Sequence, residues 1–488
     1  MPEQSLDKKT YKQRSEELKE ALLDAQFELK RQQGGPVLIL ISGNDFAGKA
    51  ELIYTFYGWL DTRRLNTRAF NLPAGIEKRM PRLWRYWRTL PPSGELGFYL
   101  GSWYHQPLMR FSRGQISEAH FQSAMEEIVR FETLLTREGV SIVKLWLHLT
   151  GPDTSKKPSA DTFKQTVAMR EWGDFSAADY DQVRDAAQRM EHLTSTEAAP
   201  WIRVQSSDEN YRDIRVAEII LDTLQQRLEA DTQESQPPVS DWPGATHRVL
   251  QELDYSARLS KDDYKEQLET WQARLRELVR HPRFNRHSLL LVFEGSDAAG
   301  KGGTIRRITQ CLDPRHLRVH GTAAPTAEEA TQPYLLRFWK RIPAPGNVVI
   351  FDRSHYGRVL VERVEGFCPA TRWQQAYQEI NDFEQQLHQS GTLVIKFWLA
   401  ITEEEQLRRF KAREKSSVKR YKLTDEDWRN REKWPAYEQA VNDMVAHTST
   451  RHAPWYLLSS EDKRHARVEA LKIVCEQLEQ RLERGKKQ

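Results

Sequence analysis

Residues 289–303 read LLLVFEGSDAAGKGG, and residues 37–51 read VLILISGNDFAGKAE. In each stretch an apolar run leads into the spacing Gly-x-x-x-x-Gly-Lys, and a segment of helical character follows. A strand, such a loop and a helix make the phosphate-binding P-loop, in which backbone N–H groups, the helix N-terminus and the lysine all face a polyanion. The sequence therefore predicts two phosphate-binding loops, one ending at Lys301 and the other at Lys49.

We expect phosphate groups to contact the second loop and the first turn of its helix, because glycines there let the backbone approach a ligand closely. Gly302 stands where an ordinary P-loop has a Ser or Thr that binds Mg²⁺, so the metal ligands must come from elsewhere. The residues predicted to bind phosphate are Gly295, Ala299, Gly300, Lys301, Gly302, Gly303 and Thr304.

The two loops belong to a longer internal repeat with a spacing of 252 residues. KLWL at 144–147 matches KFWL at 396–399, and helical periodicity precedes each loop. The stretch DTQESQPPVS at 231–240 lies between the halves and has the polar, proline-containing composition of a linker. We predict three regions: a P-loop domain over 1–230, a linker over 231–254 and a second P-loop domain over 255–488.

Length and composition bound the class of protein. The chain of 488 residues is long enough for two or three domains with full cores. The formal net charge of +4 gives no general basic field, so we expect no nucleic-acid partner. No apolar run approaches the roughly 20 residues that span a bilayer, and the charged N-terminal segment lacks the apolar centre of a secretion signal, so we expect no membrane partner.

The cysteines indicate a compartment. Cys311, Cys368 and Cys475 are widely separated and show neither a metal-binding spacing nor a disulfide framework. A reducing cytoplasm is therefore the expected location. The sequence leaves the oligomeric state, including a homo-oligomer, open.

Apolar segments alternate with helical ones throughout the second half. This alternation predicts an α/β fold, with a parallel sheet covered by helices on both faces. Ligands of such sheets bind beyond the C-terminal ends of the strands, where the second loop lies. The predicted strands are near 288–293, 317–320, 346–351, 391–399 and 455–458.

Two aspartates are the candidate metal ligands of the second half. Asp352 ends the apolar run NVVIF, the place of the acid in a Walker B motif, which holds Mg²⁺ directly or through water. Asp297 lies inside the loop, where a carboxylate among phosphate-binding amides is repulsive unless a cation lies between them. The alternatives are structural: Asp352 as a helix N-cap and Asp297 as a residue that stabilises a turn.

Arg353 follows the acid directly and is placed to contact a transferring phosphate with two N–H groups. The alternative role is a surface ion pair with Glu362 or Glu365. His355 and Tyr356 are interpreted as packing or substrate-positioning groups, because a single histidine gives no basis for a nucleophilic mechanism.

The segment RRFKAREKSSVKRYK at 408–422 holds eight basic residues and one acid. Such a run commonly forms a solvated helix face. After the predicted 391–399 strand of a P-loop domain it is also where a mobile lid closes over phosphates, supplying cations and excluding water. We predict such a lid over about 404–430.

GSDAAGKGG at 295–303, FDRSHYGRVLVERVEGF at 351–367 and KRYKLTDEDW at 419–428 together resemble the family-2 polyphosphate kinases. The resemblance covers most of 255–475 with specific motifs and about 11–225 as a degraded copy, which is similar to the fused, two-domain subgroup. It implies tandem P-loop kinase-like domains similar to thymidylate kinase. It also implies Mg²⁺-dependent transfer of phosphate between inorganic polyphosphate and nucleotides, with AMP converted to ADP.

Site roles follow from the same resemblance. Asp297 and Asp352 would be the catalytic and metal-binding acids, and Lys301 and Arg353 would contact the transferring phosphate. Arg413 and Lys422 would be lid cations that bind phosphate. The nucleotide is expected near Arg353 and Arg363, which lie on the segment after the acidic strand, and Gly357 is compatible with the AMP-using members.

The first half departs from these motifs. Leu100-Gly101 replaces Asp352-Arg353, and Ala50-Glu51 replaces Gly302-Gly303, while Asp45 and Lys49 are kept. Without gaps, Asp161 falls opposite Arg413. We therefore interpret the first half as an inactive structural or regulatory domain.

Three functions compete at this stage. The first is a Mg²⁺-dependent phosphotransferase that uses polyphosphate to convert AMP to ADP. The second is an ATP-dependent nucleoside monophosphate kinase, which the residues alone barely distinguish from the first. The third is a non-catalytic scaffold that senses phosphate, against which the intact second loop argues.

Overall fold

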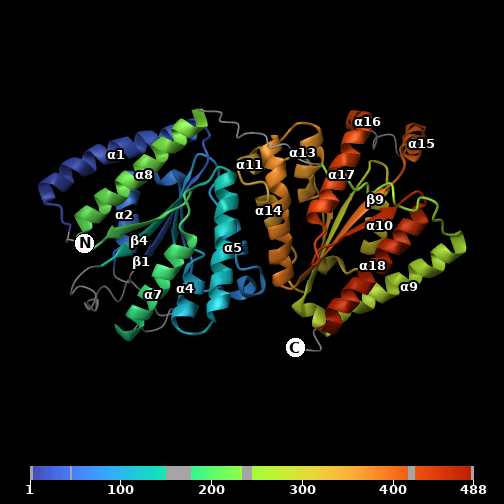
Figure 1. Ribbon diagram of the computed structural model, residues 1–488, viewed down its shortest axis with the longest axis horizontal. Helices are drawn as coiled ribbons and strands as arrows, with labels where there is room; N and C mark the ends of the chain where they lie inside the picture. Colours follow the sequence, from blue (N-terminus) through green and yellow to red (C-terminus); the bar gives the residue numbers. More distant parts are fainter. Residues whose placement is uncertain (1–3, 44–46, 150–176, 233–243, 416–423, 485–488) are drawn as a thin grey trace. The chain divides into compact units, whose positions relative to one another are not determined.

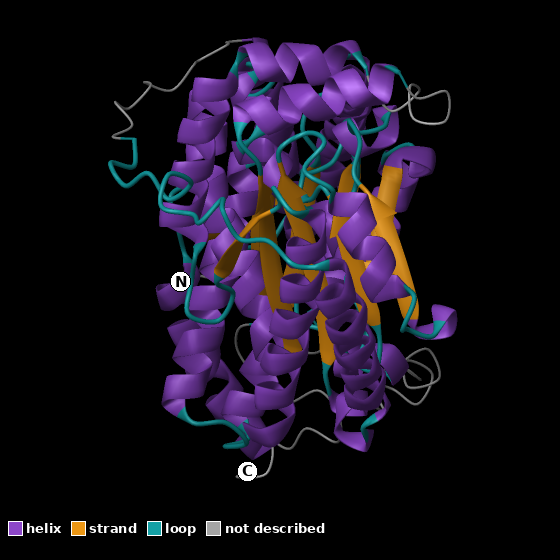
Figure 2. Cartoon of the chain, turned by 90° about the vertical axis from the view of Figure 1, so that its right-hand side faces the viewer, coloured by secondary structure: helices purple, strands orange, loops and turns teal. Residues whose placement is uncertain are grey.

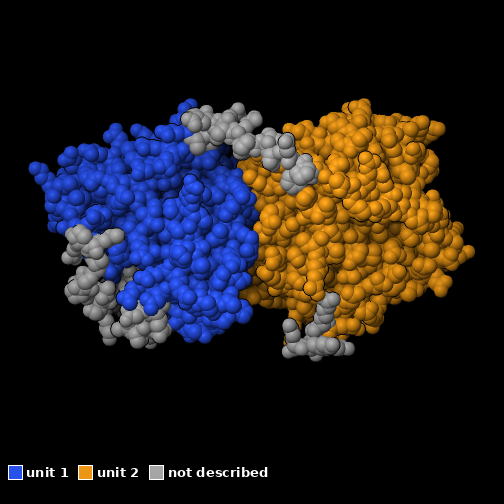
Figure 3. Space-filling model, viewed as in Figure 1, with its two compact units in different colours: residues 1–74, 83–235, 325–336 blue, residues 75–82, 236–324, 337–488 orange. Residues whose placement is uncertain are grey.

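The computed structural model describes residues 4–43, 47–149, 177–232, 244–415 and 424–484. The chain folds into two compact units, coloured separately in Figure 3. Unit 1 comprises residues 1–74, 83–235 and 325–336, and unit 2 comprises residues 75–82, 236–324 and 337–488. The main change of unit, between residues 235 and 236, falls inside the predicted linker. The two short segments assigned to the opposite unit were not predicted.

Each unit is built on a five-stranded parallel sheet (Figure 1). The order in unit 1 is β2-β3-β1-β4-β5 and in unit 2 it is β7-β8-β6-β9-β10, so the strand before each loop is central in both. The bounds in unit 1 are β1 Val37–Gly43, β2 Leu65–Ala69, β3 Leu96–Leu100, β4 Ser141–His148 and β5 Trp201–Gln205. Those in unit 2 are β6 Ser288–Gly295, β7 Leu317–Gly321, β8 Val348–Asp352, β9 Thr392–Ala400 and β10 Trp455–Ser459.

The strand predictions for the second half are confirmed, with ends shifted by one or two residues. Pairing is in the same register in the two sheets: Leu38 faces Gly97 in unit 1, and Leu290 faces Val349 in unit 2. This internal symmetry supports the repeat found in the sequence.

Helices join the strands. Those of the first half are α1 Lys8–Arg31, α2 Lys49–Trp59, α3 Trp84–Trp87, α4 His105–Ser112, α5 Glu118–Arg137, α7 Ala177–Thr194 and α8 Glu209–Thr232. Those of the second half are α9 Lys261–Arg280, α10 Lys301–Thr309, α11 Ala327–Ala330, α12 Leu336–Trp339, α13 Val361–Val364, α14 Ala370–Gln389, α15 Glu403–Glu414, α16 Asp425–Glu432, α17 Trp434–Thr448 and α18 Lys463–Arg484. Among the described residues, none of these helices is long and apolar enough to cross a membrane.

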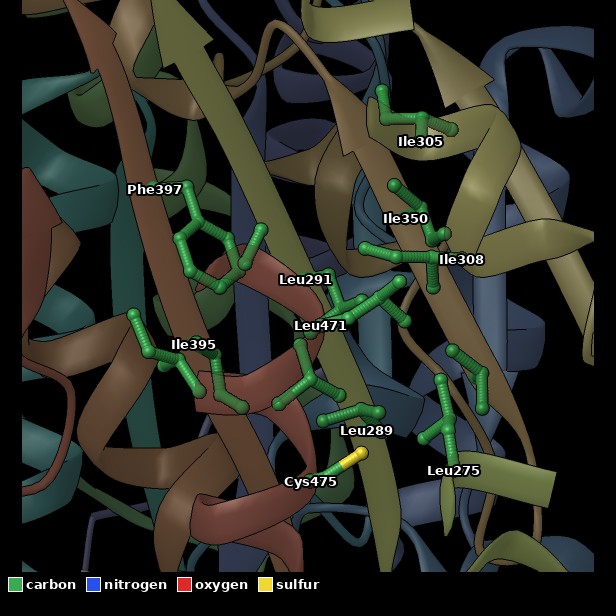
Figure 4. Packing of buried hydrophobic residues seen from close by; sticks show 14 of the residues in the cluster. Leu275, Leu289, Leu291, Ile305, Ile308, Ile350, Ile395, Phe397, Leu471 and Cys475 are labelled. Atoms are coloured by element: carbon green, nitrogen blue, oxygen red, sulfur yellow. The ribbon is translucent and has the colours of Figure 1, made fainter. Parts of the chain in front are cut away.

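Both faces of the unit 2 sheet are buried, and the strands lie among helices in Figure 2. On one face, Leu289 and Leu291 of β6 pack with Leu275 of α9, Ile305 of α10 and Leu471 of α18 (Figure 4). The alternate β6 residues are equally inaccessible. A strand buried on both faces is apolar almost throughout, which is why β6 has the continuous apolar sequence noted above.

A buried polar network on the other face recurs in both units. In unit 2 the Lys396 ammonium lies 2.7 Å from Glu384 and 2.8 Å from the Tyr356 hydroxyl. In unit 1 Lys144 makes the same contacts with Glu132 and Tyr104. Tyr356 and the neighbouring His355, which also bonds to Glu384, therefore belong to the interior, in agreement with the packing role expected for them.

Candidate active site

The second loop is shaped by two glycines. Gly295 ends β6 with φ 148°, and a Cβ there would lie 2.4 Å from the Leu399 carbonyl oxygen of β9, so no side chain fits. Gly300 caps α10 in the left-handed region, with φ 107°. The Lys301 ammonium folds back over the loop and donates to the carbonyl of Gly295 at 2.6 Å. The loop thus has the form expected of a P-loop, with its lysine held over it.

Some residues predicted to bind phosphate have a backbone N–H that already donates a hydrogen bond within the loop. The N–H of Ala299 donates to the Ser296 carbonyl, and those of Gly303 and Thr304 donate to the Gly300 carbonyl. The Thr304 side chain is buried, and its hydroxyl is 3.4 Å from the same Gly300 oxygen. The first amides of a helix have no intrahelical acceptor, so the ligand-facing donors are best sought at Gly300, Lys301 and Gly302.

The end of β8 lies beside the end of β6. Asp352 pairs in register with Phe293, and the Arg353 N–H donates to the Phe293 carbonyl at 3.0 Å. Arg353 has φ 61°, a conformation that is strained for a residue other than glycine. This conformation costs local stability, so Arg353 is not placed here by the preference of its backbone.

Glu294 supports this turn from the interior. Its carboxylate accepts a 2.7 Å hydrogen bond from the Ser354 hydroxyl. Burial raises the pKa of Glu294, although that bond and the charges of Lys301 and Arg353 oppose the change. Sequence reasoning missed this residue. The signal was present, since a carboxylate near the end of an otherwise apolar buried strand requires a specific partner.

Arg353 and Asp297 face each other across the mouth of the loop. The Arg353 Nη2 atom donates to Asp297 Oδ1 at 3.1 Å, and Nη1 lies 3.4 Å from Glu426 Oε1 of α16. Burial alone would lower the pKa of Arg353, but the charges of Asp297, Glu294 and Glu426 raise it. The ion pair with Glu362 or Glu365, considered as an alternative, is not the one formed. Glu362 instead pairs with Arg358.

α16 also contacts Asp297 through an amide. Asn430 Nδ2 donates to Asp297 Oδ2 at 2.9 Å, so both carboxylate oxygens of Asp297 accept hydrogen bonds. Asn430 was missed from the sequence because an isolated asparagine in a charged helix carries no motif. Its position shows that α16, part of the predicted 404–430 lid, reaches the loop.

The donor set at this edge fits Mg²⁺. Asp297 and Asp352 supply carboxylate oxygens. A Mg²⁺ site that handles phosphate groups uses one or two carboxylates together with those phosphates and water. No group of three or more potential ligands among His, Cys, Asp and Glu is found in the described parts of the chain, so a protein cage that binds metal without substrate is not formed there. The roles of Asp297, Lys301, Asp352 and Arg353 remain predictions.

The basic segment divides into two kinds of residue. Arg408 and Arg409 both bind Glu405, one turn earlier on α15, and the buried Arg409 also donates to the carbonyl of Ala298 at 2.9 Å. Both cations are therefore compensated, and Arg409 fastens α15 to the loop, because a buried guanidinium must satisfy its donors. Arg413 lies further along α15, near enough to Asp427 and Lys463 to affect their pKa values. Lys422 lies outside the described residues.

Arg363 is already engaged. Its guanidinium is 2.7 Å from the buried carboxylate of Asp443, donates to the Tyr377 hydroxyl at 3.0 Å and stacks on Trp373. A role in nucleotide binding remains a prediction. The contacts that hold the guanidinium orient it, and any phosphate must share it with Asp443.

Two further cations stand beside the loop and were not predicted. Lys463 and Arg467 lie on α18, one turn apart, next to Gly300 and Gly303 respectively. The sequence gave little warning, because the residues lie more than 160 positions after the loop in a helix with many charges.

The counterpart in unit 1 is built differently. Lys49 again donates to the carbonyl that ends its strand, that of Gly43, at 3.1 Å. Arg212 of α8 rests against Gly48, since a Cβ there would lie 1.8 Å from its Nη1 atom, and it pairs with Asp213 at 2.8 Å. Asp45 and Asp161 lie outside the described residues.

Comparison with known proteins gives the same two-part organisation. The family model described as Polyphosphate kinase 2 (PPK2) matches residues 5–232 and again residues 258–486. The chain is 46% identical over 482 residues to the polyphosphate:AMP phosphotransferase of Pseudomonas aeruginosa, covering 97% of each protein. It is 44% identical over 493 residues to the protein of the same name from Pseudomonas syringae pv. tomato, covering 99% of this chain and 98% of the relative.

Among solved structures, the chain resembles the crystal structure of a putative polyphosphate kinase 2 from Pseudomonas aeruginosa PA01. The TM-score is 0.88 at 45% sequence identity, and the match covers 99% of this chain and 98% of the other. The tandem arrangement is therefore shared over the full length.

Proposed function

The chain belongs to the polyphosphate kinase 2 family, and we propose that it transfers a phosphoryl group from inorganic polyphosphate to AMP, forming ADP. The observation that carries this proposal is the full-length similarity, through both repeats, to relatives named for that reaction. The geometry of the second loop supports it, because Lys301, Asp297 and Arg353 lie at the loop and Asp352 ends the neighbouring strand.

Phosphoryl transfer requires positioning and charge neutralisation more than covalent chemistry. In our proposal Lys301 turns from its loop carbonyls to the transferring phosphate, and Arg353 leaves Asp297 to donate two N–H groups to it. The hydrogen bonds from Ser354 to Glu294 and from Arg353 N–H to Phe293 hold this turn in place. The backbone that carries Arg353 therefore needs no rearrangement when its side chain moves from Asp297 to the phosphate.

We propose Mg²⁺ as the metal, with Asp297 and Asp352 as its protein ligands. Bound there, it would neutralise charge on the phosphate oxygens. Asp297 is at present bonded to Arg353 and Asn430, so an exchange of the Arg353 contact for metal and phosphate would accompany substrate binding. The free, buried thiols of Cys311, Cys368 and Cys475 suit the reducing cytoplasm in which we propose that the reaction occurs.

We further propose that the activity belongs to the second half and that the first is a structural or regulatory P-loop domain. The loop of the first half keeps Lys49, but Leu100 and Gly101 take the positions of Asp352 and Arg353. A site without the second acid lacks the ligand needed to place a divalent cation between phosphates.

The experiment that tests the function incubates the full chain with Mg²⁺, long-chain polyphosphate and either AMP or ADP, and separates the nucleotides. ADP formed rapidly from AMP, with little ATP formed from ADP, is the expected result. Parallel reactions with ATP as donor test the monophosphate-kinase alternative, which requires faster transfer from ATP than from polyphosphate. Rapid ATP formation from ADP with AMP untouched would overturn the choice of acceptor.

A further inference from the structure

α18 brings two cations to the loop from the side away from β8. α10 and α18 pack together in the core on one face of the sheet. A Cβ placed on Gly300 would lie 3.8 Å from Lys463 Cγ, and one placed on Gly303 would lie 2.9 Å from Arg467 Nη2. Both basic side chains therefore contact the first turn of α10, and the absence of a side chain at Gly303 makes room for the Arg467 guanidinium.

These cations are not explained by ion pairs. Across the described residues, neither Lys463 nor Arg467 has a carboxylate within 4.0 Å, whereas Arg464 and Lys472 on the same helix each have one. The Arg467 Nε atom is buried and, within the same residues, donates to no acceptor. A buried donor without an acceptor is destabilising, and an anion bound beside Arg467 would satisfy it.

The local field around Lys463 also favours an anion. Partial burial, and after it the charges of Arg409, Arg467 and Arg413, lower the pKa of Lys463 to about 8, while Glu405 acts in the opposite direction. Cations crowded in this way repel one another unless an anion lies among them. Phosphate groups would supply the negative charge that offsets the repulsion between these cations.

Unit 1 provides an internal comparison. After the Ala-Pro-Trp match at 199–201 and 453–455 the repeat spacing is 254 residues, so Glu209 occupies the place of Lys463, and Asp213 that of Arg467. Asp213 is satisfied there by Arg212 and by the Thr55 hydroxyl. The signs of both charges are reversed in the half whose loop also lacks the second acid. A cation does meet the first loop, since Arg212 lies against Gly48, but it is paired with Asp213. Across the described residues, Lys463 and Arg467 have no such carboxylate partner.

The order of the strands shows on which side of the loop Lys463 and Arg467 lie. The order is β7-β8-β6-β9-β10, with the loop after the central strand β6. Asp352 and Arg353 follow β8 on one side of it, and α18 follows β10 on the other. A phosphate chain that reacts beside Arg353 would extend across the loop toward α18.

We propose that Lys463 and Arg467 form a donor subsite, which binds phosphate groups of the polyphosphate chain beyond the one being transferred. The inference rests on the proposed function, because it assumes that polyphosphate is the donor. It adds to that function a chain-length dependence: donors long enough to cross the loop reach both cations, and short donors do not.

The test measures AMP phosphorylation with fractionated long-chain polyphosphate and with tripolyphosphate, for the wild-type protein and for Lys463→Ala, Arg467→Ala and Arg467→Lys. Loss of a contact with a charged group predicts a rise of roughly 10-fold or more in KM for the long chain in each alanine variant. KM for AMP and kcat at saturating donor should change less than about threefold. With tripolyphosphate the variants and the wild type should differ little, and Arg467→Lys should recover part of the long-chain affinity.

Lys472→Ala, which removes a charge from the same helix at a residue paired with Glu469, is the matched control and should behave as wild type. Unchanged long-chain KM in Lys463→Ala overturns the subsite, and so does an equal loss with both donors. Lys463 is covered only in part and its replacement leaves no buried cavity, so this variant decides the matter even if Arg467→Ala proves unstable on melting. Failure of the wild-type protein to use polyphosphate at all would instead overturn the proposed function.

Discussion

The two P-loops of this chain share the placement of a glycine and a lysine and differ in the charges around them. Each follows the central strand of a sheet with the order 2-3-1-4-5, and each has a glycine that abuts the neighbouring strand and a lysine that bonds to the carbonyl of that glycine. The positions of Asp352, Arg353, Lys463 and Arg467 in the second half are taken in the first by Leu100, Gly101, Glu209 and Asp213. The cation that contacts the first loop is instead Arg212, which is paired with Asp213. The shape of a P-loop is thus maintained by glycine and strand packing, while its chemistry depends on side chains from other elements.

One pair of equivalent residues illustrates what function imposes on the backbone. Gly101 has φ 71° and Arg353 has φ 61° at the corresponding position. Glycine adopts this conformation without strain, whereas another residue costs of order 1–2 kcal/mol. The second unit bears that cost while it holds a guanidinium opposite Asp297, whereas the first has glycine at this position. Strain confined to one of two equivalent turns is what the predicted ligand-binding role of Arg353 would entail.

The sharpest test of this asymmetry compares the two lysines. Lys301→Ala should lower kcat by on the order of a hundredfold or more, because it removes a contact that stabilises the transition state. Asp352→Asn should have an effect of the same order. Lys49→Ala, the matched change in the first loop, should leave turnover nearly intact, with steady-state rates of phosphate transfer to AMP as the measurement. If Lys49→Ala abolished turnover while its melting curve stayed at the wild-type temperature, the assignment of activity to the second half would be wrong.

The lid provides the next largest effect. Arg413→Ala should reduce kcat/KM for polyphosphate by about one to two decades, since a charge-assisted contact contributes roughly 1.5–3 kcal/mol. Screening weakens the wild-type contact at high salt, so the loss should be larger at low ionic strength. Arg408→Ala is the control on the same helix, because Arg408 is exposed and bound to Glu405. Equal losses in the two variants would reduce the segment to an ordinary charged helix face.

The fold could be predicted from the sequence because it depends on local, repeated signals. The apolar run before Lys301 and its copy before Lys49 gave the central strands, and a strand buried on both faces leaves a continuous apolar segment. The acid after NVVIF is positioned by the same strand geometry, so Asp352 was found as well. These residues are specified by their own neighbours in the chain.

The rest of the site could not be predicted because its residues are brought together only by tertiary packing. Glu426 and Asn430 reach Arg353 and Asp297 from a helix more than 120 positions after the loop. Their spacing carries no motif, since a pair between distant helices leaves no periodicity in the sequence. The count of eight basic residues and one acid in 408–422 also does not show that Glu405, outside that segment, and loop carbonyls satisfy Arg409.

A smaller effect is expected on the Mg²⁺ concentration that the enzyme needs when Asp297 is changed. Asp297→Asn keeps the hydrogen bond from Asn430 sterically feasible but removes the charge that would face Mg²⁺. The Mg²⁺ concentration for half-maximal rate should rise about tenfold or more, measured by metal titration at saturating AMP and polyphosphate. Wild-type turnover should disappear in excess chelator. Full activity under chelation would contradict a metal held at this edge of the sheet.

The smallest expected effect is a change of kcat/KM with pH, caused by Lys463 of the second unit. Because the pKa of Lys463 is lowered to about 8, the ammonium is charged at pH 7 and loses its proton as the pH rises through 8. The neighbouring charges are those of Arg409, Glu405, Arg467 and Arg413. Burial opposes the change, but Arg408 and Arg409 lower the pKa of Glu405, so this carboxylate stays ionised over the range. Phosphate groups with a second pKa near 6 are already fully charged above pH 7, so the substrates contribute little change.

In the wild-type protein, kcat/KM for long-chain polyphosphate should therefore fall by a few fold between pH 7 and pH 9. Since kcat/KM reports ionisation of the free enzyme, a rise of the Lys463 pKa in the complex with polyphosphate does not mask the change. Lys463→Ala should give a low, flat profile over the same range, and Lys463→Arg a high, flat one. A profile in Lys463→Arg that still falls through pH 8 would show that another group titrates. The charge difference between α18 and its counterpart α8 would then lose its link to donor binding.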